Sequence, residues 1–214
     1  MGPDQPTSDI GETLNEVPYF REVSPFHDWM FEMIRPYLLG RILEIGSGLG
    51  DFASLFMKYD IPIHLSDIDN HSCEILGNRF ESTSIIRRIH NIDLCHPEFA
   101  QIYSRMFGVF DLIFSLNIAK QTPIDPLAAS NAQLLLRKGG RLILLIPSHT
   151  ILFNELDQEL QDLKRYNYIF SKKLLNNCFE LRKIWYFKWI TALKPTVTDK
   201  TGLYLIIVGR KKEP

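Results

Sequence analysis

The sequence predicts an α/β fold with a mostly parallel sheet and helices on both faces of that sheet. Three observations indicate it. Short apolar runs alternate with segments of helical periodicity, each run has the length of a buried strand, and two strand-like runs late in the chain have no helical pattern between them. The 214 residues suit one domain, so we expect a flexible tail over residues 1–17 and a single domain over residues 18–214.

The first half of this domain is predicted to open with a helix over residues 26–39. Its apolar residues recur at helical spacing until the chain reaches Gly40. Strands and helices then alternate. The strands are expected at residues 41–45, 61–65 and 85–89, and the helices at residues 51–59 and 72–80.

The second half continues this alternation and then changes character. Lys138-Gly139-Gly140 is interpreted as a helix stop that precedes the most apolar strand. The last two strand-like runs could close the sheet as an antiparallel hairpin. The remaining elements are expected as strands at residues 110–116, 141–146, 179–190 and 202–209 and as helices at residues 125–136 and 155–166.

Composition indicates a soluble, cytoplasmic protein. Cys73, Cys95 and Cys178 are scattered and include no C-x-x-C pair, which argues against a zinc site and against a disulfide framework. No metal is therefore expected. The polar, acidic first residues are unlike a secretory signal. The apolar runs are far shorter than the roughly 20 residues that a membrane span needs.

The last third of the chain is basic. Residues 164–214 contain twelve Lys and Arg against three acidic residues, although the net charge of the whole chain is -1. Such a segment can bind nucleic acid or an anionic membrane surface, or its charges can simply be solvated. Its aromatic residues Trp185, Tyr186, Phe187 and Trp189 either pack in the core or form a stacking platform. No obligate protein partner is evident.

A glycine-rich turn, Gly46-Ser47-Gly48-Leu49-Gly50, is the clearest chemical signal. Alternate glycines between a strand and a helix let the backbone bend sharply and approach a ligand closely. A dinucleotide fingerprint would place its third glycine at position 51, which is Asp. An acidic side chain there disfavours a phosphate at the helix N-terminus. The spacing therefore argues against NAD, FAD and nucleoside triphosphates.

Acidic residues stand near the ends of the first three predicted strands. Asp67, twenty-one residues after Gly46, has the spacing of an acid that accepts hydrogen bonds from ribose hydroxyls. Asp93 could accept from an adenine amino group, and Glu44 could attract the ammonium of an amino-acid tail. The three acids together predict a ligand that is cationic and rich in hydrogen-bond donors.

Five motifs follow one another in residues 41–147: LEIGSGLG, HLSDID, HNIDL, FDLIFSLN and LLRKGGRLILLIP. Their order and spacing resemble those of the class I S-adenosylmethionine-dependent methyltransferases. The resemblance implies S-adenosylmethionine as cofactor and a Rossmann-like three-layer sandwich whose seven-stranded sheet ends in an antiparallel strand. It also implies a cofactor half at residues 41–147 and a substrate-facing, sheet-closing half at residues 148–214.

The same resemblance implies where the cofactor would bind. The glycine turn would wrap the methionine part, and residues after the next strands would hold the nucleoside. The implied cofactor-binding residues are Glu44, Gly46, Ser47, Gly48 and Gly50 for the methionine part, Asp67 and Ile68 for the ribose and adenine, Asp93 and Leu94 for the adenine, and Ser115, Leu116 and Asn117 for the pocket floor.

Beyond Pro147 the chain resembles a narrower group, the methyltransferases of type 11/12. Residues 153–166, which end in Lys164-Arg165-Tyr166, are similar to their "VP…LYG.LD…GHYRRY" stretch. Gln161-Asp162 replaces the Gly-His of that stretch, and Lys120-Gln121 stands where many relatives have Glu-His. If those histidines act as bases or bind substrate in the relatives, that role is missing here.

Methyl transfer from a sulfonium is an in-line displacement, which needs the acceptor held about 3–3.5 Å from the methyl carbon and water excluded. A general base helps only where the acceptor must lose a proton. The candidate catalytic residues are His149 and Tyr166. The candidates for substrate contact are Tyr19, Asp157, Arg165 and Tyr166, with His27 also above the expected pocket.

We expect a small-molecule acceptor. One alternative is an anionic acceptor, either nucleic acid or lipid-linked, which the basic last third suggests. A second alternative is a protein that binds S-adenosylmethionine without catalysis, which the departures at Lys120-Gln121 and Gln161-Asp162 suggest.

Overall fold

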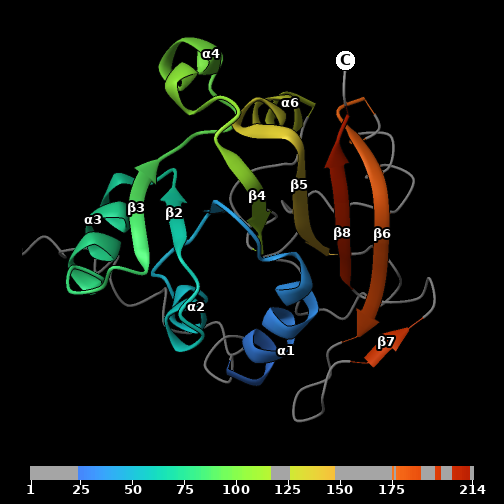
Figure 1. Ribbon diagram of the computed structural model, residues 1–214, viewed down its shortest axis with the longest axis horizontal. Helices are drawn as coiled ribbons and strands as arrows, with labels where there is room; N and C mark the ends of the chain where they lie inside the picture. The colour runs from blue at the N-terminus through green and yellow to red at the C-terminus, as the bar shows by residue number, and fades with distance from the viewer. Residues whose placement is uncertain are drawn as a thin grey trace, which may run out of the picture.

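Eight strands form a single mixed sheet within the described part of the chain (Figure 1). The computed structural model describes residues 24–116, 126–147, 175, 177–188, 196–198 and 204–212. The strands are β1 (Ile42–Ile45), β2 (Ile63–Asp67), β3 (Ile86–Asn91), β4 (Phe110–Ser115), β5 (Leu136–Pro147), β6 (Phe179–Lys188), β7 (Thr196–Thr198) and β8 (Tyr204–Lys211). Their order across the sheet is β3-β2-β1-β4-β5-β8-β6-β7.

Strands β1 to β5 are parallel, and β8 lies antiparallel between β5 and β6. This arrangement confirms the predicted Rossmann-like fold class, including its antiparallel C-terminal hairpin. The short edge strand β7 is an addition, which pairs antiparallel with β6. Its three residues are too few to show the alternation by which a strand is recognised in a sequence.

Helices cover both faces of the sheet, as predicted. In β1, Ile42 packs in one buried cluster with Phe31 and Phe56, whereas its neighbour Leu43 packs in the other with Phe99. Successive strand residues point to opposite faces, so every residue of β1 is buried. The first face carries α1 (Ser24–Ile34), α2 (Ala53–Lys58) and α3 (Asn70–Arg79), and the second carries α4 (Phe99–Ile102) and α6 (Pro126–Leu135).

Two predicted boundaries were wrong for local reasons. The first helix does not reach residue 39, because α1 gives way to the 3-10 turn η2 (Arg35–Tyr37), which contains Pro36. Lys138-Gly139-Gly140 does not separate a helix from a strand, because β5 already begins at Leu136. These residues bulge from the sheet instead, with Gly139 at φ 71°.

The segment between β3 and β4 holds two elements that the sequence pattern did not indicate, α4 and the 3-10 helix η3 (Ser104–Met106). They have four and three residues, too few for an amphipathic period. The tail predicted at residues 1–17 and the helix predicted at residues 155–166 lie outside the described residues. Among the helices that are described, none has the length and apolarity to cross a bilayer. The three cysteines form no disulfide.

Candidate functional site

The carboxyl ends of β1 to β4 meet at one edge of the sheet, because these strands are parallel and adjacent. Asp67 and Ser115 are the last residues of β2 and β4, Glu44 is the last but one of β1, and Asp93 follows β3 by two residues. The fold therefore brings the predicted acids from three separate strands to the same edge as the glycine turn.

The glycine turn is fastened to β2 by its own backbone. The N–H groups of Gly46 and Ser47 both donate to Ser66 O at 2.9 Å, and Gly50 N–H donates to Ser47 O at 2.9 Å. Gly46, Gly48 and Gly50 have φ values of 74°, 53° and 83°, a region that other residues enter only under strain. The bend is thus rigidly held and requires glycine.

The glycines of the turn face two different surroundings. A Cβ added at Gly48 would meet nothing within 4 Å, and one at Gly46 would meet only Ser115 Oγ at 4.0 Å. A Cβ at Gly50 would lie 2.5 Å from the ring of Phe80 on the α3 side. Gly46 and Gly48 therefore leave open space that a ligand can occupy, whereas Gly50 allows α3 to pack closely against the turn.

Glu44 is buried beside this turn, with 2% of its surface exposed. Every other buried side-chain oxygen or nitrogen of the described residues has a hydrogen-bond partner, but Glu44 Oε2 has none. Burial raises the pKa of Glu44 to about 8, with Asp67 raising it further and the Ser47 hydroxyl opposing the shift. A buried acceptor without a donor is costly, so this oxygen fits a ligand that brings a donor or a positive charge.

Asp67 is 1% exposed and joins the turn to β2. Its Oδ2 accepts a hydrogen bond from Gly48 N at 2.8 Å, and its Oδ1 accepts one from Asp69 N at 3.0 Å. Each carboxylate oxygen has about two acceptor sites, so Asp67 can still accept from ligand hydroxyls. The predicted ribose residue therefore also organises the glycine turn, a role that the sequence did not suggest.

Two polar residues that the sequence analysis missed support these acids. Asn91, the last residue of β3, donates from Nδ2 to Ile68 O at 2.7 Å and to Asp67 O at 3.2 Å. Ser66 Oγ donates to Glu44 O at 2.7 Å. Asn91 lies in the HNIDL motif, which is the signal that could have drawn attention to it. Ile68 next to them is 45% exposed, which leaves it accessible to a ligand.

Asp93 and Leu94 have different environments. Asp93 is half-buried, and its Oδ1 accepts from Cys95 N at 2.8 Å. The Leu94 side chain packs in the core behind β1 and β4, and Leu94 O accepts from Asn131 Nδ2 at 2.7 Å. Asp93 is therefore partly accessible after β3, whereas the Leu94 side chain belongs to the core.

The predicted pocket floor is partly described. Ser115 is fully buried, and its Oγ donates to Ile45 O at 2.7 Å, which ties β4 to β1 directly under Gly46. Leu116 is half-buried against the cluster on the α1 side. Asn117 and the candidates for catalysis or substrate contact at Tyr19, His149, Asp157, Arg165 and Tyr166 lie outside the described residues.

His27 is a candidate for substrate contact that the structure does describe. It lies on α1, with its ring edge-on to Phe52 at a centroid distance of 5.6 Å. Burial lowers the pKa of His27, and Asp51 and Asp28 partly oppose this. α1 therefore places a neutral imidazole next to the helix that follows the glycine turn.

The described part of the chain contains no group of three or more His, Cys, Asp or Glu side chains that could hold a metal ion. What it offers at the carboxyl edge is a buried acceptor at Glu44, a second carboxylate at Asp67 and open space over Gly46 and Gly48. These residues fit S-adenosylmethionine, which carries positive charge and donor groups.

Comparisons with known proteins find likeness in structure alone. The chain matches no protein-family model and no curated protein. A methyltransferase of Thermotoga maritima that depends on S-adenosylmethionine, described as a possible histamine N-methyltransferase, aligns with a TM-score of 0.65 at 18% identity, over 92% of this chain and 96% of that one.

Two further structures give the same result. A methyltransferase of Methanosarcina mazei that depends on S-adenosylmethionine aligns with a TM-score of 0.62 at 15% identity, over 84% of this chain and 96% of that one. A putative methyltransferase of Bacillus halodurans C-125 also aligns with a TM-score of 0.62 at 15% identity, over 85% of this chain and 98% of that one. The chain therefore has the fold of the class I methyltransferases, as the sequence resemblance implied.

Proposed function

We propose that this chain, which has the class I methyltransferase fold, is an S-adenosylmethionine-dependent methyltransferase that acts on a small-molecule acceptor. The observation that carries the proposal is the buried Glu44 carboxyl, whose Oε2 has no partner among the described residues and which adjoins the open glycine turn. A cationic ligand supplies both the charge and the donor that this carboxyl lacks.

The residues of the carboxyl edge would each hold a different part of the cofactor. When bound, S-adenosylmethionine supplies a methyl group made electrophilic by its sulfonium. Glu44 would accept from the ammonium of the methionine part, Asp67 from the ribose hydroxyls and Asp93 from the adenine amino group. Gly46 and Gly48 would let the backbone approach without a Cβ in the way. No side chain needs to act as nucleophile, because an in-line displacement depends on position and on the exclusion of water.

Glu44 also couples cofactor binding to protons. With a pKa of about 8, its carboxyl holds a proton at neutral pH in the free protein. A positive charge beside it favours the ionised form and lowers the pKa. Cofactor binding at pH 7 is therefore expected to release part of a proton, which calorimetry in buffers of different ionisation enthalpy would measure.

A small-molecule acceptor is favoured over a polyanion by what the described basic residues of the last third contact. Arg182 pairs with Glu180 at 2.6 Å, Lys183 lies over the Trp185 ring at 4.5 Å, and Lys211 Nζ donates to Leu136 O at 2.6 Å. These contacts give the charges structural roles within the sheet-closing strands. The T. maritima protein is described as a possible histamine N-methyltransferase, so small amines are a reasonable first acceptor panel here.

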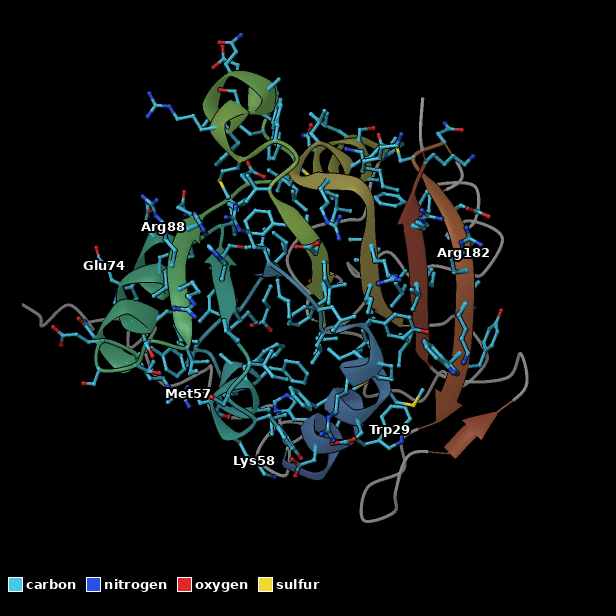
Figure 2. The ribbon with its side chains drawn as sticks, viewed as in Figure 1. Trp29, Met57, Lys58, Glu74, Arg88 and Arg182 are labelled. Carbon is cyan, nitrogen blue, oxygen red and sulfur yellow. The ribbon has the colours of Figure 1, made fainter. Side chains whose placement is uncertain are left out.

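Calorimetry with S-adenosylmethionine and with its demethylated product tests the proposal. Asp67→Ala should weaken binding of both by about 1–3 kcal/mol, the range for loss of a charged hydrogen-bond partner. Asp67→Asn, which keeps one oxygen acceptor for the Gly48 N–H, separates ligand contact from damage to the turn. Glu74→Gln is the matched control, because Glu74 is an exposed acid on α3 (Figure 2).

Two outcomes would contradict the proposal. A chain that binds neither compound, yet binds a phosphate-bearing nucleotide at the glycine turn, is not an S-adenosylmethionine enzyme. Binding of the cofactor without methyl transfer to any acceptor in a broad panel would instead favour the non-catalytic alternative. Transfer only to nucleic acid or to lipid would favour the anionic acceptor.

A further inference from the structure

The loop that follows β3, residues 92–95, is held by side chains from two helical elements. The Asp93 N–H donates to the Tyr103 hydroxyl at 3.2 Å, and Asn131 Nδ2 donates to Leu94 O at 2.7 Å. Tyr103 directly follows α4, and Asn131 lies in the middle of α6, so both contacts come from the second face of the sheet. The backbone before and after the Asp93 side chain is therefore fixed by groups outside the loop.

The Asp93 carboxylate is also oriented within the loop. Its Oδ1 accepts from the Cys95 N–H at 2.8 Å, and the Asp93 carbonyl oxygen accepts from the His96 N–H at 3.2 Å. Within the described residues, no hydrogen bond or ion pair reaches Oδ2. A carboxylate with one oxygen fixed and the other unpaired suits a ligand that brings a single donor group.

Asn131 is an unusual residue for its position. It is 5% exposed, and the alanines around it, Ala128, Ala129 and Ala132, pack in the core. Asn is a weak helix former, and a buried amide costs free energy unless it is hydrogen-bonded. An apolar residue would avoid this cost, but it would leave the carbonyl of the buried Leu94 without this donor. The bond satisfies both groups when the loop follows this path, so Asn131 selects the path.

We propose that Asn131 and Tyr103 are positioning residues, which hold the loop so that Asp93 selects adenine as the base of the cofactor. This inference rests on the proposed function, in which Asp93 accepts a hydrogen bond from the adenine amino group. The bonds at Asp93 N and at Leu94 O fix the direction in which the Asp93 side chain leaves the backbone. Neither positioning residue needs to touch the cofactor for this role.

The choice of base is the property that this positioning controls. Adenine carries an amino donor where hypoxanthine carries a carbonyl acceptor, and a carboxylate accepts from the first and repels the second. A site that hydrogen-bonds one group of a ligand strongly rejects an analogue that lacks it, because the partner is left unpaired. Loss of the positioning contacts therefore lowers base selectivity more than it lowers overall affinity.

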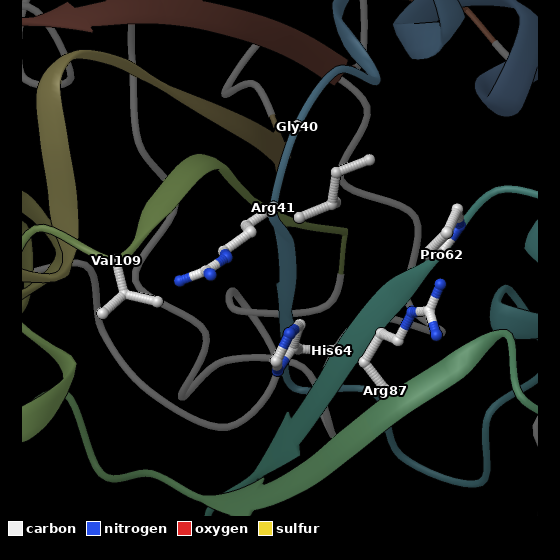
Figure 3. A pocket seen from close by; sticks show the side chains of 7 residues that line it. Gly40, Arg41, Pro62, His64, Arg87 and Val109 are labelled. Atoms are coloured by element: carbon white, nitrogen blue, oxygen red, sulfur yellow. The ribbon is translucent and has the colours of Figure 1, made fainter.

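The opposite end of the sheet, the amino edge where β1 to β4 begin, has a different character. A pocket of about 300 Å³ opens there beside Pro62, His64 and Val109 (Figure 3). Its wall is largely apolar, and the side chains of Arg41 and Arg87 extend away from each other. Arg87 is an extra residue of β3 in its pairing with β2, and such bulges redirect side chains. The polar edge of a base is therefore better matched by the loop after β3.

Gln133 provides a matched control on the same helix as Asn131. Its Nε2 donates to Cys178 O at 2.8 Å, which ties α6 to the residue before β6. Gln133→Ala and Asn131→Ala thus both remove an amide that donates to a backbone carbonyl, and both are expected to lower the free energy of unfolding. Of the two residues, Asn131 is the one that contacts the loop after β3.

The test titrates the full chain by calorimetry with the demethylated product of S-adenosylmethionine and with its analogue that carries hypoxanthine in place of adenine. The unaltered protein should prefer the adenine compound by about 10- to 100-fold, the range for a hydrogen bond to a charged group. Asn131→Ala should reduce this preference by about threefold or more, as residues in one hydrogen-bond network are coupled. Tyr103→Phe, which removes a single oxygen, should reduce it by about twofold or more. Gln133→Ala should leave it unchanged.

A double-mutant cycle with Asp93→Ala separates positioning from a general loss of structure. In the Asp93→Ala background the preference is already lost, so adding Asn131→Ala should change it no further. A merely structural role would lower the affinity for both compounds by the same factor and leave their ratio unaltered. If Asn131→Ala does not fold, Tyr103→Phe carries the same cycle.

Two results would overturn the inference while leaving the proposed function intact. One is a preference for adenine that stays unchanged in Asn131→Ala and Tyr103→Phe, or that falls equally in Gln133→Ala. The other is equal binding of the two compounds by the unaltered protein, which would show that Asp93 does not read the amino group. An unaltered protein that binds neither compound would instead refute the proposed function and this inference with it.

Discussion

The two ends of strands β1 to β4 carry opposite charges and hold them in opposite ways. At the carboxyl edge, Glu44 and Asp67 are 2% and 1% exposed. Toward the amino edge, Arg41, Arg87 and Arg88 are exposed, and the half-buried Asp111 pairs with Arg137. The same strands therefore carry buried acidic side chains at one end and exposed basic side chains toward the other.

This difference affects the stability of the protein without ligand, because the buried carboxyl lowers it and the exposed arginines hardly change it. A buried carboxyl without a partner lowers the stability of the empty protein, and a ligand that supplies the partner restores it. Exposed arginines keep their hydration and lose little when no anion is present. A ligand that pairs with Glu44 would thus raise the stability of the protein, whereas the exposed arginines need no partner.

The largest expected effect is on the free energy of unfolding, and it tests whether Gly50 serves packing while Gly48 leaves space for a ligand. Gly50→Val should lower the free energy of unfolding by about 3–5 kcal/mol, because its side chain would overlap Phe80 and Leu76 and its φ of 83° disfavours a β-branched residue. Urea unfolding measures this loss.

Gly48→Ala is the control for that experiment. A Cβ there meets nothing within 4 Å, so only the backbone cost of about 1–2 kcal/mol is expected. Cofactor affinity should fall, because the methyl group occupies the open space. Equal destabilisation by the two substitutions would show that the distinction between the glycines is wrong.

The second prediction concerns the buried acid. With a pKa raised from 4.5 to about 8, Glu44 holds a proton in the folded protein that the unfolded chain releases. The free energy of unfolding should therefore fall as the pH rises from 5 to 8. Glu44→Gln removes this dependence and should be more stable than the unaltered protein at pH 8 by roughly 2–4 kcal/mol. The prediction is contradicted if the free energy of unfolding changes by the same amount between pH 5 and pH 8 in Glu44→Gln and in the unaltered protein.

The third prediction concerns His90 of β3, where the sign is opposite. Burial lowers the pKa of His90 to about 4 in the folded protein. Between pH 4 and 6.5 this histidine is therefore protonated in the unfolded chain and neutral in the folded protein. Stability present above pH 6.5 should be lost as the pH falls, by about 1 kcal/mol once solvent screening of this half-buried ring is allowed for. His90→Gln should flatten the acid side of the profile, and a flat profile in the unaltered protein would contradict the assignment.

The smallest effect is expected at the rim of the glycine turn. Arg79 Nη1 pairs with Asp51 Oδ1 at 2.9 Å and also donates to Leu49 O. Both side chains are exposed, so Arg79→Gln should cost about 0.5 kcal/mol by urea unfolding. Arg35→Gln, which removes another exposed ion pair, with Glu32, is the control. A loss several times larger in Arg79→Gln alone would mean that this arginine holds the turn in shape.

Much of the carboxyl edge could be predicted from the sequence, because each of its residues follows a recognisable strand within a few positions. Each strand has its own apolar run, and the acids and glycines follow these runs at fixed distances. The order of parallel strands then brings the strand ends together. What local patterns cannot show is the second use of a residue, such as the hydrogen bond from Gly48 N to Asp67.

The contact between His64 and His90 was not predicted, because it depends on the register of two strands. His64 and His90 are 26 residues apart and meet through the pairing of β2 with β3. The extra residue at Arg87 is a property of that pairing and not of either segment alone. The bulge at Lys138-Gly139-Gly140 was misread for the same reason, since a Gly-Gly pair marks a helix end and a strand irregularity equally well.

The position of β8 has a consequence for how the molecule is made. Of the described strands, β8 is synthesised after all the others, yet it lies between β5 and β6 and pairs with both. Until it inserts, the N–H and C=O groups along that edge of β5 have no partner strand and can pair with other nascent chains. Synthesis of this protein therefore includes an interval of vulnerability to aggregation, during which a chaperone that shields strand edges would raise the yield.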